Sequence, residues 1–393
     1  MDAVRRELFA GEILYQQGDP SDCAWLVESG AIQLSAARGG EAAVHGVVGP
    51  GELIGELGLL EGAPRTATAT AQVETMLLAI DHDLFVERLD KCDPIVRALV
   101  GGLRRRARTL LAALPPEVAV PAEDLPGDDA GEKSGIDKIR LEAQLRDALH
   151  QEALHVHYQP ILDIVTGKVA SYEALVRWDL PGRGPVSPAE FIKLAEETSL
   201  IVPVGEYVLD HAIELLKQLH AKGDPAAIAV NLSARQLVEP GMARQVVSRI
   251  RRAGLPAGAL KLEVTESRML DYGQVASVMD HCREHGVPFA LDDFGTGYSN
   301  LTHLHRLHFE YVKVDQGFVR SMFSSPRAMA IVDAIVAMAH GIGADVVMEG
   351  VETKAQLQRL RELKVRYAQG WLVGKAQSAD AVLSGAAARV VLE

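Results

Sequence analysis

The chain contains few cysteines, no excess of basic residues and no long apolar run. Its three cysteines, Cys23, Cys92 and Cys282, lie far apart, which disfavours a disulfide framework or a cysteine zinc site and indicates a reducing compartment. Polar or charged residues interrupt every apolar stretch before the roughly 18 residues that a membrane span requires, and the N-terminus lacks the apolar core of a signal peptide. We therefore expect a cytoplasmic protein without a membrane span.

Positive charge is also scarce. Forty Lys and Arg residues face 53 Asp and Glu residues, so the formal net charge is -13. Binding to a nucleic-acid backbone is driven by Lys and Arg, which makes DNA an unexpected partner. The Arg104–Arg108 run is interpreted as the solvated face of a helix. An acidic chain of this kind can bind a small anion, but only through metal ions or a local arginine.

A linker divides the chain. Residues 115–132 contain four prolines, six acidic residues and no basic residue, so we place a linker over residues 115–135. Just before it, the four-residue spacing of Ile95, Leu99 and Leu103 predicts an amphipathic helix that could pair with a second copy of itself. We expect a homodimer, with one domain at 1–114 and another at 136–393.

The two domains show different sequence patterns. Within residues 1–85, short strand-like pieces such as AWLVE, AIQLS and TMLLAI alternate with Gly and Pro turns, which predicts an all-β jelly-roll-like barrel with flanking helices. From residue 137 onward, eight apolar strand candidates alternate with helical stretches. They are HVHYQPIL, ASYEALVRW, AIAVNLS, LKLEVTES, PFALDDFG, YVKVDQG, DVVMEGVE and YAQGWLVG. Their number and spacing predict an α/β fold, a (β/α)8 barrel of the TIM type.

Polar residues close each of the seven later strands. In a barrel of this type, the chemistry gathers where the parallel strands end. A single acid there is most simply a solvated strand end or a helix cap, but that interpretation does not explain one such residue on every strand. The residues are Glu173, Asn231, Glu263, Glu266, Asp292, Asp293, Lys313, Asp315, Glu349 and Gln369.

Besides Asp315, these residues include six carboxylates: Glu173, Glu263, Glu266, Asp292, Asp293 and Glu349. If they converge on one barrel mouth, they repel one another strongly unless cations neutralise them. Oxygen ligands without cysteine, and without histidine at the strand ends, favour Mg2+ or Mn2+ over zinc. The adjacent Asp292 and Asp293 suggest a ligand shared by two ions, an arrangement that suits phosphodiester hydrolysis.

The second domain resembles a known family at this point. The segment 158–371 carries, in order, the motifs EALVRW, PAEFIKLAEETSLI, VNLS, LEVTES, LDDFGTGYSNL, KVD, EGVET and QG. It looks like the EAL family of cyclic-di-GMP phosphodiesterases. The resemblance implies an enzyme that hydrolyses one phosphodiester bond of cyclic-di-GMP and releases linear pGpG.

The resemblance also implies roles for individual residues. One metal ion would be held by Glu173, Asn231, Glu263 and Asp292, and a second by Asp292, Asp293 and Glu349, with Asp292 bridging the two. Lys313 would orient and help activate the water, with Gln369 beside it. Glu266 would fix the loop FGTGYSNL, which in the family links the metal site to dimer contacts. Gln159, Arg177 and Asp315 would contact the substrate, Arg177 through its phosphate.

In the first domain, the segment GELIGELGLLEGAPRTATATA at 51–71 is the informative one. A turn there could offer backbone N–H groups to a phosphate, Arg65 could neutralise its charge, and Glu56 could accept a hydrogen bond from a ribose hydroxyl. The plain alternative is a surface ion pair between these two residues. Residues 7–113 resemble the cyclic-nucleotide-binding domain of bacterial cAMP receptor proteins, which implies a site at Gly55, Glu56, Leu57, Arg65 and Thr66.

Together these observations predict a cyclic-di-GMP phosphodiesterase that a cyclic mononucleotide regulates. We expect cAMP rather than cGMP as the effector, and activation as its effect. No helix-turn-helix follows the first domain, so a transcription factor is not indicated. One alternative is a receptor with little turnover that holds cyclic-di-GMP and signals by contacting a partner. Hydrolysis of cyclic AMP is a weaker alternative, because the first domain lacks a set of metal-ligand carboxylates.

Overall fold

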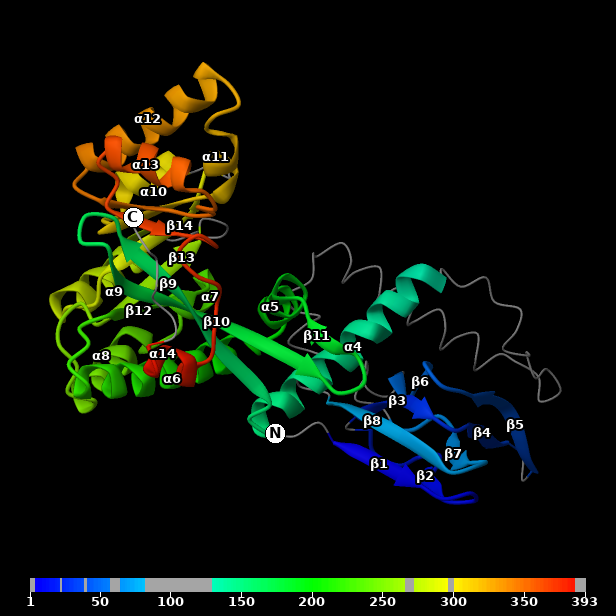
Figure 1. Ribbon diagram of the computed structural model, residues 1–393. Coiled ribbons are helices and arrows are strands. Elements are labelled where there is room, and N and C mark those ends of the chain that lie inside the picture. Colours follow the sequence, from blue (N-terminus) through cyan, green and yellow to red (C-terminus); the bar gives the residue numbers. More distant parts are fainter. Residues whose placement is uncertain are drawn as a thin grey trace. The chain divides into compact units, whose positions relative to one another are not determined.

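The structure is a computed structural model that describes residues 4–21, 23–38, 41–56, 64–81, 129–265, 272–295 and 300–385 (Figure 1). It divides into two compact units, residues 1–150 and 151–393. The expected dimer helix at 95–114 and the linker up to residue 128 lie outside the described residues. Among the helices that are described, none combines the length and the apolar character needed to cross a membrane.

The first unit consists of two four-stranded antiparallel sheets, with strand orders β1-β8-β3-β6 and β2-β7-β4-β5. The strands are β1 (Arg5–Leu8), β2 (Ile13–Tyr15), β3 (Cys23–Ser29), β4 (Ile32–Arg38), β5 (Glu41–Val48), β6 (Leu53–Ile54), β7 (Thr68–Ala71) and β8 (Thr75–Asp81). Alternate side chains of both sheets, among them Trp25, Val27, Ile32 and Leu77, meet in one apolar core. The expected all-β first domain is confirmed.

A long helix, α4 (Asp129–His150), completes the first unit. Its Ala143 packs against Leu26 and Leu78, on the face of the β1-β8-β3-β6 sheet away from the apolar core. The helix begins at Asp129, so the last residues of the segment expected as linker are helical. The last proline of that segment is Pro126, so nothing after it prevents a helix.

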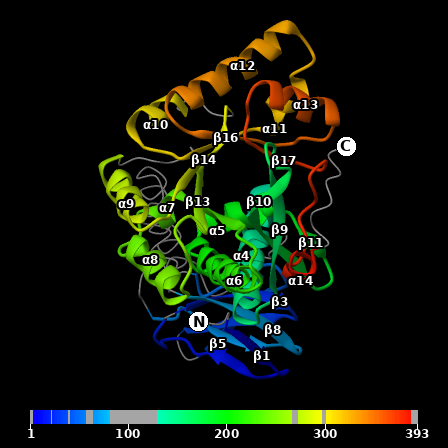
Figure 2. The same ribbon diagram turned by 60° about the vertical axis from the view of Figure 1, so that its left-hand side comes forward.

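The second unit is a closed barrel of eight strands surrounded by helices (Figures 1 and 2). Its strands are β9 (Leu154–Asp163), β10 (Lys168–Leu180), β12 (Ala227–Leu232), β13 (Leu260–Thr265), β14 (Phe289–Phe294), β15 (Tyr311–Val314), β16 (Asp345–Met348) and β17 (Tyr367–Gln369), with the short β11 (Gly184–Val186) paired to the end of β10. The expected TIM-type barrel is confirmed.

The helices of this unit follow the strands in the expected alternation. They are α5 (Pro188–Glu197), α6 (Ile201–Ala221), α7 (Ala234–Leu237), α8 (Met242–Arg252), α9 (Tyr272–Glu284), α10 (Asn300–Arg306), α11 (Gln316–Ser321), α12 (Pro326–Gly341), α13 (Lys354–Glu362) and α14 (Ala379–Leu383). Their apolar faces and the outer faces of the strands form one large core. Because the core lies between strands and helices, the inner faces of the strands are left for other side chains.

One strand departs from a uniform parallel barrel. β9 runs antiparallel to both of its neighbours, β10 and β17, whereas the seven other barrel strands run parallel to one another. A tight turn between Asp163 and Lys168 joins β9 to β10, and Asp163 Oδ1 accepts hydrogen bonds from the backbone N–H groups of Val165 and Thr166. A connection this short can join only antiparallel strands. The start of β9 therefore lies at the end of the barrel where the parallel strands finish.

Candidate functional site

A buried lysine occupies the centre of the barrel mouth. Lys313, on β15, has only 1% of its side chain exposed. Its Nζ lies 2.8 Å from Glu263 Oε2, 2.9 Å from Glu349 Oε1, 3.0 Å from Asp292 Oδ1 and 3.4 Å from Glu173 Oε2. These four carboxylates come from four other strands or strand ends, so the barrel brings together residues up to 176 positions apart in sequence. The convergence expected from the strand-end pattern is present for these four carboxylates.

The charges of this cluster change one another's proton affinity. Burial alone would lower the pKa of Lys313, but Asp292 and the glutamates hold it well above the usual range of a lysine. Burial raises the pKa of Glu263 well above its ordinary value and that of Glu349 to about 7. Glu173 is also buried, yet Lys313 and two amide donors lower its pKa. Lys313 is therefore a firmly protonated hydrogen-bond donor, not a base.

Amide side chains form hydrogen bonds with Glu173 and with one another. Asn231 Nδ2 donates a 2.8 Å hydrogen bond to Glu173 Oε1, and Gln369 Nε2 donates a 2.6 Å bond to Glu173 Oε2. Gln369 Nε2 also lies 3.2 Å from Gln159 Oε1, and Gln159 Nε2 donates to the carbonyl of Gly374. Both oxygens of Glu173 are thus held in place. The expected site residues Gln159, Asn231 and Gln369 all lie at the mouth.

The two adjacent aspartates need a local distortion to act together. In a regular strand, neighbouring side chains point to opposite faces. Here the β14–β15 pairing shifts register between Leu291 and Phe294, and Asp293 has a left-handed backbone with φ of 55°. As a result, ligand oxygens of Asp292, Asp293 and Glu349 lie within 4.8 Å of one another. Such strained backbone at a non-glycine residue is typical of functional sites.

The oxygen atoms form two overlapping groups that suit metal ions. Glu173, Glu263 and Asp292 make one group within 4.8 Å, and Asp292 also belongs to the group with Asp293 and Glu349. Five carboxylates and one ammonium carry four net negative charges when all are ionised, which two divalent cations would balance. Carboxylate and amide oxygens are the donors that Mg2+ and Mn2+ prefer. The residues present therefore fit two such ions.

Other expected site residues lie around this cluster. Arg177 is on β10 beyond Glu173, half-buried, and its Nη1 donates a 3.0 Å bond to the carbonyl of Val176. Asp315 caps α11 by accepting a 2.8 Å bond from the N–H of Gly317. The Asp315 side chain therefore caps a helix and also lies near the barrel mouth. Glu266 and residues 296–299 of the FGTGYSNL loop lie outside the described residues.

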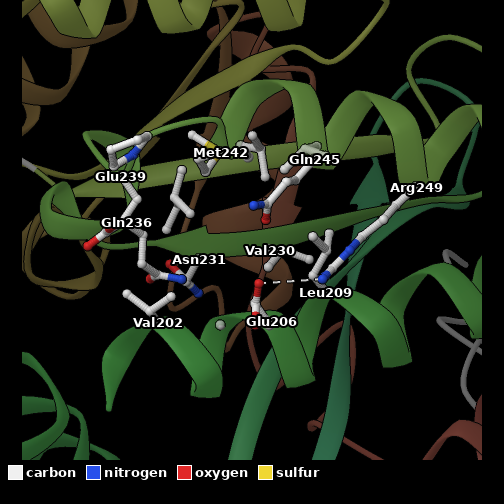
Figure 3. Close-up of a pocket in the computed structure, with 15 residues that line it drawn as sticks. Val202, Glu206, Leu209, Val230, Asn231, Gln236, Glu239, Met242, Gln245 and Arg249 are labelled. Atoms are coloured by element: carbon white, nitrogen blue, oxygen red, sulfur yellow. Dashed lines mark hydrogen bonds and ion pairs between the residues drawn. The ribbon is translucent and has the colours of Figure 1, made fainter. Parts of the chain in front are cut away.

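A cavity of about 130 Å³ lies beside the mouth, between α6, α7, α8 and strands β12 and β13 (Figure 3). Most of its wall is apolar, and an ion pair joins Glu206 to Arg249 across it at 3.5 Å. Asn231 is part of this wall, but none of the five carboxylates lines the cavity. The cavity therefore contacts Asn231, one of the expected metal ligands, but does not reach the carboxylate cluster.

In the first unit, Arg65 is 5% exposed and folds over the turn at Gly55. Its Nη1 donates a 3.3 Å bond to the Gly55 carbonyl, its Nη2 lies 3.8 Å from Cys23 Sγ, and its guanidinium stacks on Tyr15 with Cζ 4.3 Å from the ring centre. Glu56 and Thr66 are exposed nearby, and Leu57 lies outside the described residues. Tyr15 and Cys23 were not predicted as site residues, because their contacts with Arg65 join segments that are distant in sequence and leave no local motif.

Both units match the sequence profiles of known protein domains. Residues 142–376 match the sequence profile of the EAL domain, and residues 5–92 that of the cyclic nucleotide-binding domain. The cyclic di-GMP phosphodiesterase NbdA of Pseudomonas aeruginosa is 40% identical over 240 residues, which are 61% of this chain and 31% of NbdA. The cyclic di-GMP phosphodiesterase PdeR of Escherichia coli is 37% identical over 242 residues, 61% of this chain and 36% of PdeR. The chain spans about a third of the length of the curated relatives it matches.

Solved structures resemble the chain over one or both units. The EAL enzyme Bd1971, in its form bound to cAMP and cyclic-di-GMP, is 27% identical with a TM-score of 0.65, and the similarity covers 97% of this chain and 99% of that chain. The PaMucR phosphodiesterase in complex with c-di-GMP is 39% identical with a TM-score of 0.58, over 62% of this chain and 99% of that chain. The resemblance expected from the motifs is confirmed. Because the EAL profile matches more than half of its residues, this chain belongs to the EAL domain family.

Proposed function

We propose that this chain is a cyclic-di-GMP phosphodiesterase that hydrolyses its substrate to pGpG at the barrel mouth. The observation that carries the proposal is the convergence of five carboxylates at the barrel mouth, four of them within 3.4 Å of Lys313 Nζ, with Asp292 common to both oxygen groups. Relatives named cyclic di-GMP phosphodiesterase share 37–40% of their residues with the barrel, which supports the same chemistry here.

Mg2+ or Mn2+ would be bound by the two oxygen groups. Glu173, Asn231, Glu263 and Asp292 would hold one ion, and Asp292, Asp293 and Glu349 the other. Two such ions supply Lewis-acid stabilisation of the negative charge on the phosphate oxygens. In the reaction, one water molecule adds to phosphorus, one P–O bond to a ribose oxygen breaks, and the proton released from the water ends on that leaving oxygen.

The side chains of the mouth orient the reacting groups. Lys313, protonated and within 3.4 Å of four carboxylates, donates hydrogen bonds from a fixed position and so orients the attacking water. Asn231 and Gln369 hold the two oxygens of Glu173 and prevent its rotation. Gln159 and Asp315 contact the substrate, and Arg177 binds a phosphate oxygen. Glu266 fixes the loop that follows Asp293.

The first domain is proposed to bind cAMP, with cGMP as the alternative ligand, at Gly55, Glu56, Leu57, Arg65 and Thr66. The Bd1971 structure, which resembles this chain over both units, holds cAMP and cyclic-di-GMP together, and this supports the pairing of a sensor with an enzyme. An effector changes activity only if it binds two states of the protein unequally. We propose activation in a cytoplasmic homodimer whose protomers pair through the 95–114 helix.

One chromatographic assay tests the proposal. Cyclic-di-GMP is incubated with the full chain in Mg2+ or Mn2+, with and without cAMP or cGMP, and pGpG is measured. We expect metal-dependent pGpG formation that cAMP increases, and loss of turnover in Glu173→Ala. Tight binding of cyclic-di-GMP without turnover in any condition would instead favour the receptor. Formation of AMP from cAMP would favour hydrolysis of the mononucleotide.

A further inference from the structure

The strands β9 and β10 continue together beyond the carboxylate cluster. Their antiparallel register places Gln159 opposite Glu173, His157 opposite Leu175 and His155 opposite Arg177. Because β9 runs against the parallel strands, its first residues lie at the mouth end of the barrel. At about 3.4 Å per residue, His157 stands roughly 7 Å above Gln159 along the strand. This two-stranded extension therefore forms a wall above the site.

The alternation of the two strands shows which side chains face the site. Tyr158, Ala174 and Trp178 are buried on the outer face, and the Trp178 ring meets Phe191 of α5 edge-on, with centroids 5.7 Å apart. Side chains at the intervening positions point to the opposite face, which is the face of Gln159 and Glu173. His155, His157 and Arg177 belong to this inner face. They are exposed or half-buried, so a ligand in the mouth can reach them.

The inner face of this wall carries groups that bind anions. The register, with His155 opposite Arg177 and His157 opposite Leu175, places the three groups close together. Burial lowers the pKa of His157, the positive charges of Arg177 and His155 lower it further, and Asp179 raises it. Arg177 also interacts with the charge of Glu173. A guanidinium and two imidazoles thus stand side by side above a cluster of opposite charge. The guanidinium and the imidazole N–H groups can donate hydrogen bonds to an anion that lies between them.

Cyclic-di-GMP carries two phosphodiester groups, and only one of them can be hydrolysed at the carboxylate cluster at a time. We propose that His155, His157 and Arg177 form a subsite for the second phosphate of a cyclic dinucleotide. The inference rests on the proposed function, because it concerns the substrate of the same site. His157 and His155 are positioning residues that fix the ring of the substrate and do not touch the reacting phosphorus.

The test compares two substrates in the full chain with saturating Mn2+. Cyclic-di-GMP has a second phosphate, whereas bis(p-nitrophenyl) phosphate has one phosphate only. His157→Ala, and the double variant His155→Ala/His157→Ala, are expected to raise KM for cyclic-di-GMP about tenfold or more with kcat changed less than about threefold. Turnover of bis(p-nitrophenyl) phosphate should stay within about twofold of wild type. His157→Gln keeps a hydrogen-bond donor and should recover part of the affinity.

His211→Ala is the matched control. His211 is exposed on α6, where its Nδ1 lies 2.8 Å from the carbonyl oxygen of Tyr207 and its ring contacts the Tyr207 ring. Its replacement should therefore leave KM and kcat unchanged for both substrates. An unchanged KM for cyclic-di-GMP in the double variant would overturn the proposed subsite. An equal loss of turnover for both substrates would also overturn it, because that result indicates damage to the hydrolytic centre. Wild type that hydrolyses neither substrate would instead contradict the proposed function.

Discussion

Lys313 and Glu263 form a buried ion pair in which Nζ and Oε2 are 2.8 Å apart and both side chains are at most 3% exposed. The same ammonium contacts three further carboxylates. Replacing Lys313 with Met should leave these carboxylates without a cation in metal-free protein and lower stability by about 3–5 kcal/mol. Turnover should fall by at least about 100-fold because the donor at the mouth is lost. Calorimetric melting without and with Mg2+, together with the pGpG assay, measures both effects.

Lys375→Met serves as the control for this substitution. Lys375 is exposed and stacks its Nζ on the Trp371 ring at 5.2 Å, so the same change in chemistry there should leave the melting temperature within about 1 °C. Added Mg2+ should recover part of the stability lost in Lys313→Met. An unchanged metal-free melting temperature in that variant would show that the cluster does not depend on Lys313.

Glu349 links metal binding to pH. Burial raises its pKa to about 7 in the metal-free chain, so the group is mostly neutral below pH 7 and a carboxylate above it. A cation binds the carboxylate, and the apparent affinity for Mg2+ should therefore weaken as the pH falls from 8 to 6, with protons released on binding. Titration calorimetry in two buffers of different ionisation enthalpy measures the proton release. In Glu349→Gln the affinity should be lower and less dependent on pH.

The barrel was accessible to sequence analysis because its strands are continuous apolar runs separated by amphipathic helices. Each of the eight segments named from the sequence coincides with part or all of a barrel strand. The antiparallel direction of β9 was not predicted, since an apolar run such as HVHYQPIL carries no sign of its direction. Only the short turn after Asp163 determines it, through the two hydrogen bonds that Asp163 accepts.

The site was predicted as a set of residue types, but not its geometry. Glu173 was expected at a strand end, whereas β10 continues to Leu180 because it pairs with β9 and then β11. The joint orientation of Asp292 and Asp293 depends on a register shift and a left-handed backbone, neither of which the sequence LDDFG specifies. The positions of His155 and His157 above the site were not predicted. Side chains along β9 alternate between two faces, and the inner face can be identified only when the position of β9 in the barrel is known.

Lys261 is a second cation of the barrel interior, half-buried, and we expect it to destabilise the fold at neutral pH. Burial lowers its pKa from 10.5 to about 8, although its Nζ lies 3.9 Å from the centre of the Tyr311 ring. Between pH 8 and 10.5 the unfolded chain binds more protons at this lysine than the folded chain, so its contribution to stability rises with pH. Lys261→Met should therefore be more stable than wild type at pH 7, by about 2 kcal/mol.

The stabilising effect of Lys261→Met should shrink toward zero by pH 10, where the wild-type lysine is mostly neutral in the folded chain. Calorimetric melting of both proteins at pH 7 and pH 10, in metal-free buffer, measures the difference. An advantage of equal size at the two pH values would mean that better packing, and not the charge of Lys261, explains the result.

Gly55 leaves room for the guanidinium of Arg65. Its φ is +78°, and a Cβ atom built on it would lie 2.3 Å from Arg65 Nη1 and 3.5 Å from the Tyr15 hydroxyl. Gly55→Ala should displace the guanidinium and weaken cAMP binding by at least about tenfold, since one charge-assisted contact to a phosphate is worth about 1.5–3 kcal/mol. Titration calorimetry with cAMP on the full chain measures the loss.

Gly11→Ala separates this clash from backbone strain. Gly11 has a similar φ of +88° but no atom within 4 Å of a built Cβ, so both variants should lose about 1 kcal/mol of stability while only Gly55→Ala loses cAMP affinity. If the two variants bound cAMP equally well, the position of the Arg65 guanidinium against Gly55 would not matter for the nucleotide. The phosphate would then have to be held elsewhere in the first unit.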